Sequence, residues 1–477
     1  MLKRLRIQNF KIWKDTGTIE LAPLTVLLGS NSSGKSSIGQ FLMLLKQSVA
    51  SSDRKSVLMT GNENSAVDIG LPSEMIFNKE TSHPLSFNYS WDTDKYSFSD
   101  PQSKKYYNFD TIDFFADVEV KDVAMQSLEA KKFEYTLSQD KGFILKVGLQ
   151  KKEEGANGNR GYELVYDNYS FTRSVGRAWP ITSPVRFYGF PDEAVAYYQN
   201  ADFLQKLNLF QEKLFSKFYY LGPLRTKAKR IYTWTGNTPD SVGFQGEDTI
   251  FAILAAKNQQ RMLNTKHGGK RKGFDIVIGE MLKKMNLIDD IKIERISEIR
   301  QDYVVKIKTK GSGNWVDIPD VGFGVSQVLP VLVELFYAPP GSTIIMEQPE
   351  LHLHPGAQAG LADVMIDAVH ANEYSGKRNI QLIIETHSEH FLRRLQRRIA
   401  EEALEYDNFR AYFVNTQKFP PSLDGLEVDL FGNIANWPQG FFGDISGDIA
   451  MQSKAAIDRR IRDRDKAFLD VADKVDE

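Results

Sequence analysis

The chain has 477 residues, of which 42% are hydrophobic, so it is long enough to bury substantial cores. Its 60 basic and 62 acidic residues nearly cancel, which removes any argument from bulk charge for a nucleic-acid coat or a membrane-surface protein. The absence of cysteine excludes disulfides, thiolate metal sites and a cysteine nucleophile. The first ten residues carry charges where a secretion signal needs an apolar run, and no segment approaches the roughly 18 apolar residues of a membrane span. We therefore expect a cytoplasmic protein with no membrane partner.

The first 50 residues predict strands followed by a glycine-rich loop and a helix. Two short strands are expected at residues 2–10 and 18–21, and the continuous apolar run at residues 24–28 predicts a buried strand that stops at Gly29. Residues 37–47 then carry apolar side chains at helical spacing.

The loop between that strand and that helix satisfies the pattern G-x-x-x-x-G-K-[ST], which is typical of a phosphate-binding loop. Backbone N–H groups of such a loop surround the phosphates, Lys35 supplies a positive charge for the β and γ oxygens, and the Ser36 hydroxyl ligates Mg²⁺. The predicted nucleotide-binding residues are Gly29, Ser30, Asn31, Ser32, Ser33, Gly34, Lys35, Ser36 and Ser37.

The middle of the chain, from about residue 62 to residue 314, has a different texture. Short aromatic and β-branched segments alternate with polar turns, which favours a β-meander with strands at residues 87–91, 133–137, 143–149 and 162–171. A helix is expected at residues 203–215 and a strand at 217–221. The basic cluster at residues 266–272 is more typical of a surface loop than of a nucleic-acid site.

After residue 321 helices and strands alternate again, which predicts a largely parallel sheet. The expected helices are residues 326–337, 356–370 and 389–404, and the expected strands are residues 343–346, 380–385 and 409–414. A phosphate-binding loop needs a distant acid for its metal at the end of a second buried strand, and Glu347 stands at that position.

The segment IIMEQPELHLHP at residues 344–355 resembles the Walker B strand and following loop of ABC-type ATPases, in the branch that contains SMC proteins, RecF and OLD-family nucleases. Three further segments resemble motifs of the same branch: DVGFGVSQ at 320–327 its signature, ETHS at 385–388 its switch histidine, and LRIQNFKIW at 5–13 its first strand.

This resemblance implies an α/β fold, namely a P-loop ABC-type ATPase head with a mainly parallel sheet, split by a long β-rich and helical insertion. The implied division is an N-terminal lobe of the head at 1–60, the insertion at 61–315, a C-terminal lobe at 316–420 and an extension at 421–477.

The resemblance also implies a head-to-head dimer with ATP and Mg²⁺ between two copies of the chain. The signature of one copy would then close on the γ-phosphate that Lys35 of the other copy holds; the implied signature residues are Gly322, Gly324, Ser326 and Gln327. The usual order of this motif is L-S-G-G-Q, whereas glycine precedes serine here.

Four residues are expected to act on the bound nucleotide. Glu347 would bind Mg²⁺ with Ser36, and His387 would hydrogen-bond the γ-phosphate. Gln348 stands where the branch has a catalytic glutamate; it can orient a water but cannot accept its proton, and a positioned base is worth about 10² to 10⁴ in rate. Either hydrolysis is slow, or a relocated base such as Glu350 compensates.

Several other clusters allow two interpretations. His352 and His354 fit the loop after Walker B better than a zinc site. Arg393, Arg394, Arg397 and Arg398 fit a solvated helix face that pairs with Glu401 and Glu402 better than a phosphate-backbone contact. Trp437, Phe441 and Phe442 are expected to cover an edge of the head rather than to dock a partner, and Arg225 and Arg230 match an LGPLR-like segment without an assigned role.

The sequence thus predicts an ATPase that forms a homodimer or higher oligomer and controls a separate effector, a nuclease or toxin, in anti-phage defence or DNA repair. The alternatives are a scaffold that senses ATP without hydrolysing it, a repair factor that binds DNA directly, and the motor of an ABC transporter. The long insertion and the unusual signature argue against the transporter.

Overall fold

The computed structural model describes residues 1–140, 142–153, 161–176, 180–265, 269–311, 313–437 and 450–461. The chain divides into two compact units, Met1–Ala435 and Asn436–Glu477. The first unit contains all the strands described below and the predicted nucleotide site.

The core of the first unit is a six-stranded sheet in the order β10-β17-β20-β4-β21-β22. Its strands are β10 (Phe218–Leu221), β17 (Thr343–Glu347), β20 (Gln381–Glu385), β4 (Leu24–Gly29), β21 (Phe409–Asn415) and β22 (Ser422–Gly425). All neighbours run parallel except the β21–β22 pair. Every residue of β4, β17 and β20 is buried, which is the burial expected of central parallel strands. The sheet is therefore mainly parallel, as predicted.

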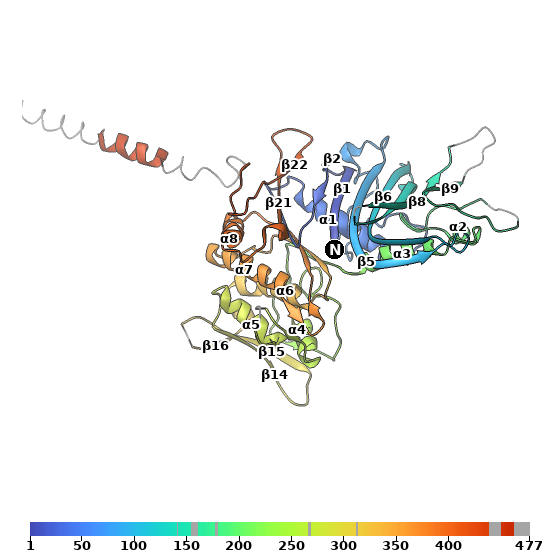
Figure 1. Ribbon diagram of the computed structural model, residues 1–477. Coiled ribbons are helices and arrows are strands. Elements are labelled where there is room, and N and C mark those ends of the chain that lie inside the picture. Colours follow the sequence, from blue (N-terminus) through green and yellow to red (C-terminus); the bar gives the residue numbers. More distant parts are fainter. Residues whose placement is uncertain are drawn as a thin grey trace, which may run out of the picture. The chain divides into compact units, whose positions relative to one another are not determined.

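Helices accompany this sheet in the order that the alternating sequence predicts (Figure 1). They are α1 (Lys35–Ala50), α6 (Phe323–Tyr337), α7 (Pro355–His370) and α8 (Glu389–Ala400). Pro355 opens α7 as a first-turn proline, and the Ser388 side chain caps α8 by accepting a hydrogen bond from the N–H of Phe391.

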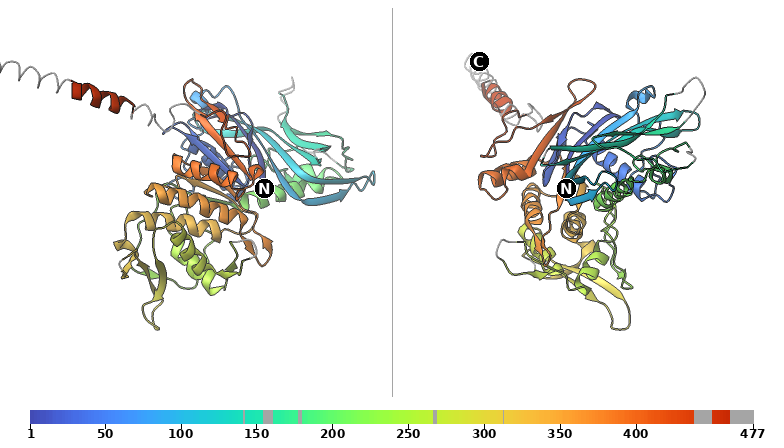
Figure 2. Two further views of the ribbon diagram at one scale, coloured as in Figure 1. Left: turned by 60° about the vertical axis from the view of Figure 1, so that its left-hand side comes forward. Right: turned by 45° about the vertical axis from the view of Figure 1, so that its right-hand side comes forward.

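A second, antiparallel sheet joins the start of the chain to the meander in the order β2-β1-β5-β6-β7-β8-β9, with β3 beside β1. The strands are β1 (Leu2–Phe10), β2 (Trp13–Asp15), β3 (Ile19–Glu20), β5 (Leu85–Ser99), β6 (Tyr106–Asp122), β7 (Ser127–Gln139), β8 (Gly142–Lys151) and β9 (Tyr162–Asp167). Helix α3 (Phe203–Ser216) packs on this sheet through ring contacts such as Tyr89 with Phe215 and Tyr96 with Phe210 (Figure 2). Aromatic side chains dominate this part of the core.

The remaining elements lie between β10 and α6 in the sequence. Helices α4 (Thr249–Asn258) and α5 (Phe274–Lys284) accompany a small sheet of β11 (Tyr232–Thr233), β15 (Asp302–Lys308), β14 (Asp290–Arg295) and β16 (Trp315–Asp317). Short elements complete the unit: α2 (Asp192–Ala196), the pairs β12 (Met262–Leu263) with β13 (Lys272–Gly273) and β18 (Asn372–Glu373) with β19 (Gly376–Lys377), and 3-10 turns at Phe77–Lys79, Ile318–Asp320 and Tyr406–Asn408.

The observed sheets cut across the division expected from the sequence. Strand β5, in the predicted insertion, pairs with β1 of the predicted N-terminal lobe. Strand β10, also in the predicted insertion, pairs with the Walker B strand β17 in the core sheet. Strand β6, which the sequence analysis did not predict, lies between β5 and β7. Strand pairing is non-local, so a boundary placed by local texture cannot anticipate it.

The second unit carries a helical segment at residues 450–461, within the charged helix that the sequence predicts from residue 445 onward. Phe441 and Phe442 lie outside the described residues, and Trp437 belongs to this second unit. Within the described part of the chain, no helix combines the length and the apolar character needed to cross a membrane.

Candidate functional site

The loop from Gly29 to Gly34 has the backbone that a phosphate-binding loop requires. Gly29, Ser32 and Gly34 have φ of 151°, 58° and 99°, and Gly34 is the N-cap of α1. A Cβ atom on Gly34 would lie 2.3 Å from Cγ2 of Ile12, so glycine is required there by both space and backbone conformation. The first amides of α1 therefore face the loop without a capping side chain.

Trp13 fastens this loop to the antiparallel sheet. Its Nε1 donates to Oγ of Ser37 at 2.8 Å and to the carbonyl of Gly34 at 3.2 Å, and the ring is fully buried. A neighbouring lysine, Lys11, donates from Nζ to Oε1 of Gln40 at 2.6 Å. Both residues stand in the segment that resembles the first strand of the ABC-type branch, so the structure gives that segment a physical role at the loop.

Lys35 lies beneath the loop with only 3% of its surface exposed. Its Nζ donates to the carbonyls of Ser30 at 2.7 Å and Gly29 at 3.0 Å, and it lies 3.9 Å from Oε1 of Glu385. Burial lowers the pKa of Lys35, while the carboxyl groups of Glu385, Glu350 and Glu347 oppose this effect. The lysine is thus held by carbonyls and acids at the place where a triphosphate would bring further negative charge.

Glu347 and Glu385 end two neighbouring parallel strands in direct register. Burial, and then the charge of Glu385, raise the pKa of Glu347 to about 7, although its Oε1 accepts a hydrogen bond from Tyr220 at 2.8 Å. Burial also raises the pKa of Glu385, which accepts a hydrogen bond from the hydroxyl of Ser36. The three predicted parts, Walker A lysine, Walker A serine and Walker B acid, therefore converge at the carboxyl edge of the core sheet.

This group of side chains fits a magnesium ion. The two acids are packed side by side in a buried place, and Oε2 of Glu385 has no hydrogen-bond partner among the described residues. Mg²⁺ is usually bound by one or two carboxylates together with phosphate oxygens and water. Ser36, Glu347 and Glu385 are the residues that would hold it, and the bound ion would neutralise charge on the β- and γ-phosphates. Glu385 is a candidate ligand that the sequence analysis did not assign.

The turn after the Walker B strand contains Gln348 and Glu350. Gln348 adopts a left-handed conformation with φ of 44°, and its N–H donates to the carbonyl of Glu385 at 2.8 Å. Oε1 of the buried Glu350 accepts hydrogen bonds from Oγ1 of Thr386 at 2.6 Å and from the N–H of His387 at 2.9 Å. Glu350 therefore orders the switch-histidine segment directly.

His387 follows β20 and reaches back to the phosphate-binding loop. Its imidazole hydrogen-bonds the backbone of Gly29, and burial together with the charge of Lys35 lowers its pKa. A neutral imidazole beside Gly29 is placed to hydrogen-bond a terminal phosphate.

The structure brings two further residues to this site whose roles were not predicted. Tyr220 ends β10 and donates to Glu347, and Arg225 follows in the next loop with Nη2 3.3 Å from the carbonyl of Glu347. The only sequence signal for them was the LGPLR-like segment, which by itself implies no chemistry.

The predicted signature forms the N-terminus of α6, with Gly322 as the N-cap and Ser326 and Gln327 in the first turns. A Cβ atom on Gly324 would lie 3.3 Å from the carbonyl of His352, so this helix start packs closely on the loop after β17 of its own chain. Asp320, just before it, forms a two-point ion pair with Arg230 at 2.7 and 2.8 Å.

The arginine cluster on α8 is engaged in ion pairs. Arg394 and Arg398 both donate to the buried Asp363 of α7, and Arg393 and Arg397 pair with glutamates on their own helix. The partner of Arg398 is Glu401 together with Asp363. These contacts support the interpretation as an ordinary helix face.

The other two predicted alternatives gain little from the structure. In the basic loop, Arg271 stacks on Tyr374 and Lys272 pairs with Glu280, while residues 266–268 lie outside the described residues. His354 caps α7 by accepting a hydrogen bond from Gly356. Among the described residues no group of three or more His, Cys, Asp or Glu side chains is arranged to hold a metal ion, so the zinc alternative for His352 and His354 has no further ligand.

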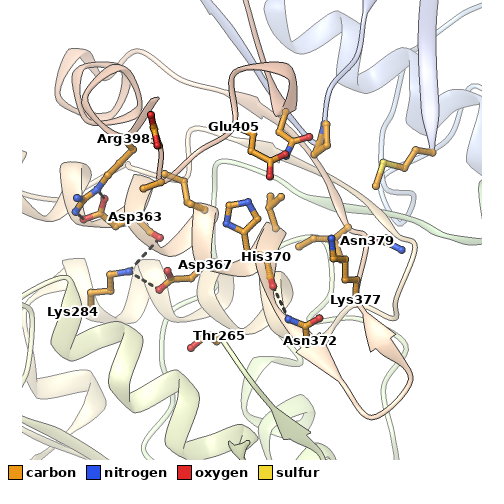
Figure 3. Close-up of a pocket in the computed structure, with 18 residues that line it drawn as sticks. Thr265, Lys284, Asp363, Asp367, His370, Asn372, Lys377, Asn379, Arg398 and Glu405 are labelled. Atoms are coloured by element: carbon orange, nitrogen blue, oxygen red, sulfur yellow. Dashed lines mark hydrogen bonds and ion pairs between the residues drawn. The ribbon is translucent and has the colours of Figure 1, made fainter. Parts of the chain in front are cut away.

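A polar cavity of about 790 Å³ lies at the other edge of the core sheet (Figure 3). Pro23 and Ile380, which directly precede β4 and β20, line it, whereas the phosphate-binding loop follows β4. Its charged side chains include the pair Lys284 and Asp367, joined at 2.6 Å. The cavity is therefore separate from the nucleotide site.

The fold and the site together define an ATP-binding P-loop ATPase, with the core sheet order and the convergent motifs of the ABC type. Residues 1–168 match the family model "AAA ATPase domain", and residues 226–393 match the family model "AAA domain, putative AbiEii toxin, Type IV TA system". Residues 404–452 match the DUF3696 family, described as a protein of unknown function. The chain is an ABC-type ATPase of the SMC/RecF/OLD kind.

Solved structures similar to the chain include three SMC heads at 10–12% sequence identity. The SMC head bound to the C-winged helix domain of ScpA has a TM-score of 0.39, with 90% of this chain and 98% of that chain covered. The SMC head from Thermotoga maritima has a TM-score of 0.37 with coverage of 90% and 99%, and the Pyrococcus furiosus head bound to the C-terminal domain of ScpA has 0.40 with 89% and 96%. No curated protein matches the chain in sequence.

Proposed function

We propose that this protein binds ATP and Mg²⁺ between two copies of itself and hydrolyses the nucleotide slowly. The observation that carries the proposal is the convergence of Lys35, Glu347, Glu385 and His387 at one edge of the core sheet. In the proposed dimer, Gly322, Gly324, Ser326 and Gln327 of one copy contact the γ-phosphate held by the partner. The amides at the start of α6 suit that anion.

Slow turnover follows from the residues at the Walker B turn. Gln348 can orient the attacking water through its amide but cannot accept a proton. Glu350 has one carboxylate oxygen occupied by Thr386 and His387, so it serves better as a support for the switch segment than as a relocated base. The ATP-bound dimer is therefore long-lived and suited to control a separate effector.

We further propose that the effector is a nuclease or toxin in anti-phage defence or DNA repair, and that the protein works in the cytoplasm. The match of residues 226–393 to a family described as a toxin of a toxin–antitoxin system is consistent with this setting. Direct DNA binding through α8 is less favoured because Arg394 and Arg398 are committed to Asp363.

The first experiment measures ATP binding and phosphate release with the wild-type chain and with Lys35→Ala. Loss of a buried ammonium that would contact phosphate is expected to weaken ATP binding by roughly 10- to 100-fold, from about 1.5–3 kcal/mol for a charged hydrogen bond. Light scattering with ATP and Mg²⁺ should detect a dimer with the wild type and not with Lys35→Ala. Wild-type protein that binds no adenine nucleotide would refute the proposed function.

The second experiment separates slow hydrolysis from ATP sensing without hydrolysis. Gln348→Glu supplies the missing base and should raise the rate of phosphate release by about 10² or more while leaving ATP binding in place. Slow but measurable wild-type release that disappears in Lys35→Ala favours the ATPase. No release from the wild type together with release from Gln348→Glu would favour the non-hydrolysing scaffold.

A further inference from the structure

Arg225 is buried in an unusual way next to the Walker B turn. It follows β10, whose carboxyl end lies beside the carboxyl end of β17. Only 8% of Arg225 is exposed, whereas its chain neighbour Leu224 is 76% exposed. Stability alone favours the opposite arrangement, with leucine inside and arginine in water. The chain therefore buries a charge here at the expense of an apolar side chain.

The contacts of Arg225 are made with the catalytic turn. Its Nη2 donates to the carbonyl of Glu347 at 3.3 Å and to the carbonyl of Gln348 at 3.4 Å. Its Nε and Nη1 have no hydrogen-bond partner among the described residues, and the same holds for Oε2 of Glu350. Burial lowers the pKa of Arg225 to about 10, and the nearby charge that opposes this shift is Glu350. The guanidinium is thus held by the turn rather than by a full ion pair.

We propose that Arg225 is a positioning residue that holds the Walker B turn in its hydrolytic geometry, by joining the loop after β10 to the loops after β17 and β20. It acts on Gln348 through that residue's carbonyl, and on the switch segment through the charge of Glu350, which accepts hydrogen bonds from Thr386 and His387. This role rests on the proposed hydrolysis of ATP.

The need for such a support is visible in the backbone. Gln348 has φ of 44°, a conformation that costs a residue with a side chain roughly 1 kcal/mol or more and persists only where its surroundings impose it. The guanidinium bonds the carbonyls on both sides of that residue's amide, so it opposes relaxation of the turn. Displacement of Gln348 by about 1 Å is enough to change a hydrolysis rate by about 10².

The test compares Arg225→Gln, Arg225→Lys and the matched control Arg261→Gln. Arg261 also donates to two carbonyls, those of Tyr337 and Ala338, and pairs with a glutamate, Glu373, but before β17 rather than after it. For each protein one measures thermal stability, the Kd for ATP, kcat for phosphate release, and hydrogen exchange of residues 347–353.

Arg225→Gln is expected to lower kcat by roughly 10- to 100-fold with little change in the Kd for ATP, and to speed hydrogen exchange at residues 347–353. Arg225→Lys keeps the charge and should restore part of kcat. Arg261→Gln should change stability but neither kcat nor exchange at residues 347–353.

Unchanged kcat and unchanged exchange in a folded Arg225→Gln protein would overturn the proposal, and so would equal effects of Arg225→Gln and Arg261→Gln. If the wild type binds ATP without hydrolysing it, proposed turnover fails, but hydrogen exchange at residues 347–353 still decides whether Arg225 holds the turn. A loss confined to the Kd for ATP would assign Arg225 to substrate binding and also refute the positioning role.

Discussion

Glu334 is a buried acid whose ionisation should make the stability of the protein depend on pH. It lies inside α6 with no exposed surface, and its Oε2 accepts a hydrogen bond from the N–H of Val242 at 2.9 Å. Its Oε1 has no hydrogen-bond partner among the described residues. Burial raises the pKa of Glu334 from 4.5 to about 7, although the Val242 amide and the positive charges of Lys46 and Arg378 oppose the rise.

The sign of the effect follows from which state keeps the proton. Below pH 4.5 Glu334 is protonated in both the folded and the unfolded chain, and its contribution does not change with pH. Between pH 4.5 and about 7 the unfolded chain releases the proton first, so the free energy of unfolding falls as pH rises, by about 3 kcal/mol in total. Above that window the loss is complete and constant.

The substitution Glu334→Gln removes the ionisation and keeps an oxygen that can accept the Val242 hydrogen bond. Its amide replaces the hydroxyl of the protonated acid at the unpartnered position, so the two proteins should have similar unfolding free energies at pH 5. At pH 8 the variant should be more stable by about 3 kcal/mol, measured by urea unfolding. Glu63→Gln, at an exposed position, is the control. Parallel stability–pH curves for Glu334→Gln and wild type would refute the reasoning.

Two other substitutions test the phosphate-binding loop and the packing of α7 on α8. Gly34→Ala places a Cβ atom 2.3 Å from Ile12 at φ of 99° and should cost about 2–3 kcal/mol in thermal unfolding as well as ATP binding. Gly17→Ala, at φ of 66° with open space around it, should cost about 1 kcal/mol, and equal costs would mean that the clash is absent. Asp363→Asn removes the shared partner of Arg394 and Arg398 and should cost about 2 kcal/mol in urea unfolding, because those arginines are only partly exposed. The exposed partner Glu401→Gln should cost less than about 0.5 kcal/mol, and a similar cost for both would contradict the assigned burial.

The parts of the fold that local pattern encodes were predicted well. The buried run before Gly29, the glycine loop and the helix after it are contiguous in sequence, and the structure has them as β4, the loop and α1. The later helices and strands were also predicted to within a few residues, because each combines a clear period with a clear stop. Ser388 and Pro355, for example, mark helix starts by their own chemistry.

The parts that depend on distant partners were not predicted. Arg225 and Tyr220 reach the site only because β10 pairs with β17, more than 120 residues away in sequence, and nothing local to the segment signals that pairing. Glu385 was known as part of a motif, but its place beside Glu347 comes from the register of β17 with β20. The roles of Gly322, Gly324, Ser326 and Gln327 toward a second copy stay predictions.

The sheet that carries β1 and β2 also has a mechanical consequence. Trp13 ties β2 to the carbonyl of Gly34 and to Ser37, and β1 lies hydrogen-bonded between β2 and the long strand β5. A tug on the far hairpins of the meander would travel along one continuous ladder of strands and arrive at the start of α1. A molecule that grips those hairpins would then alter how tightly nucleotide is held, without touching the nucleotide itself.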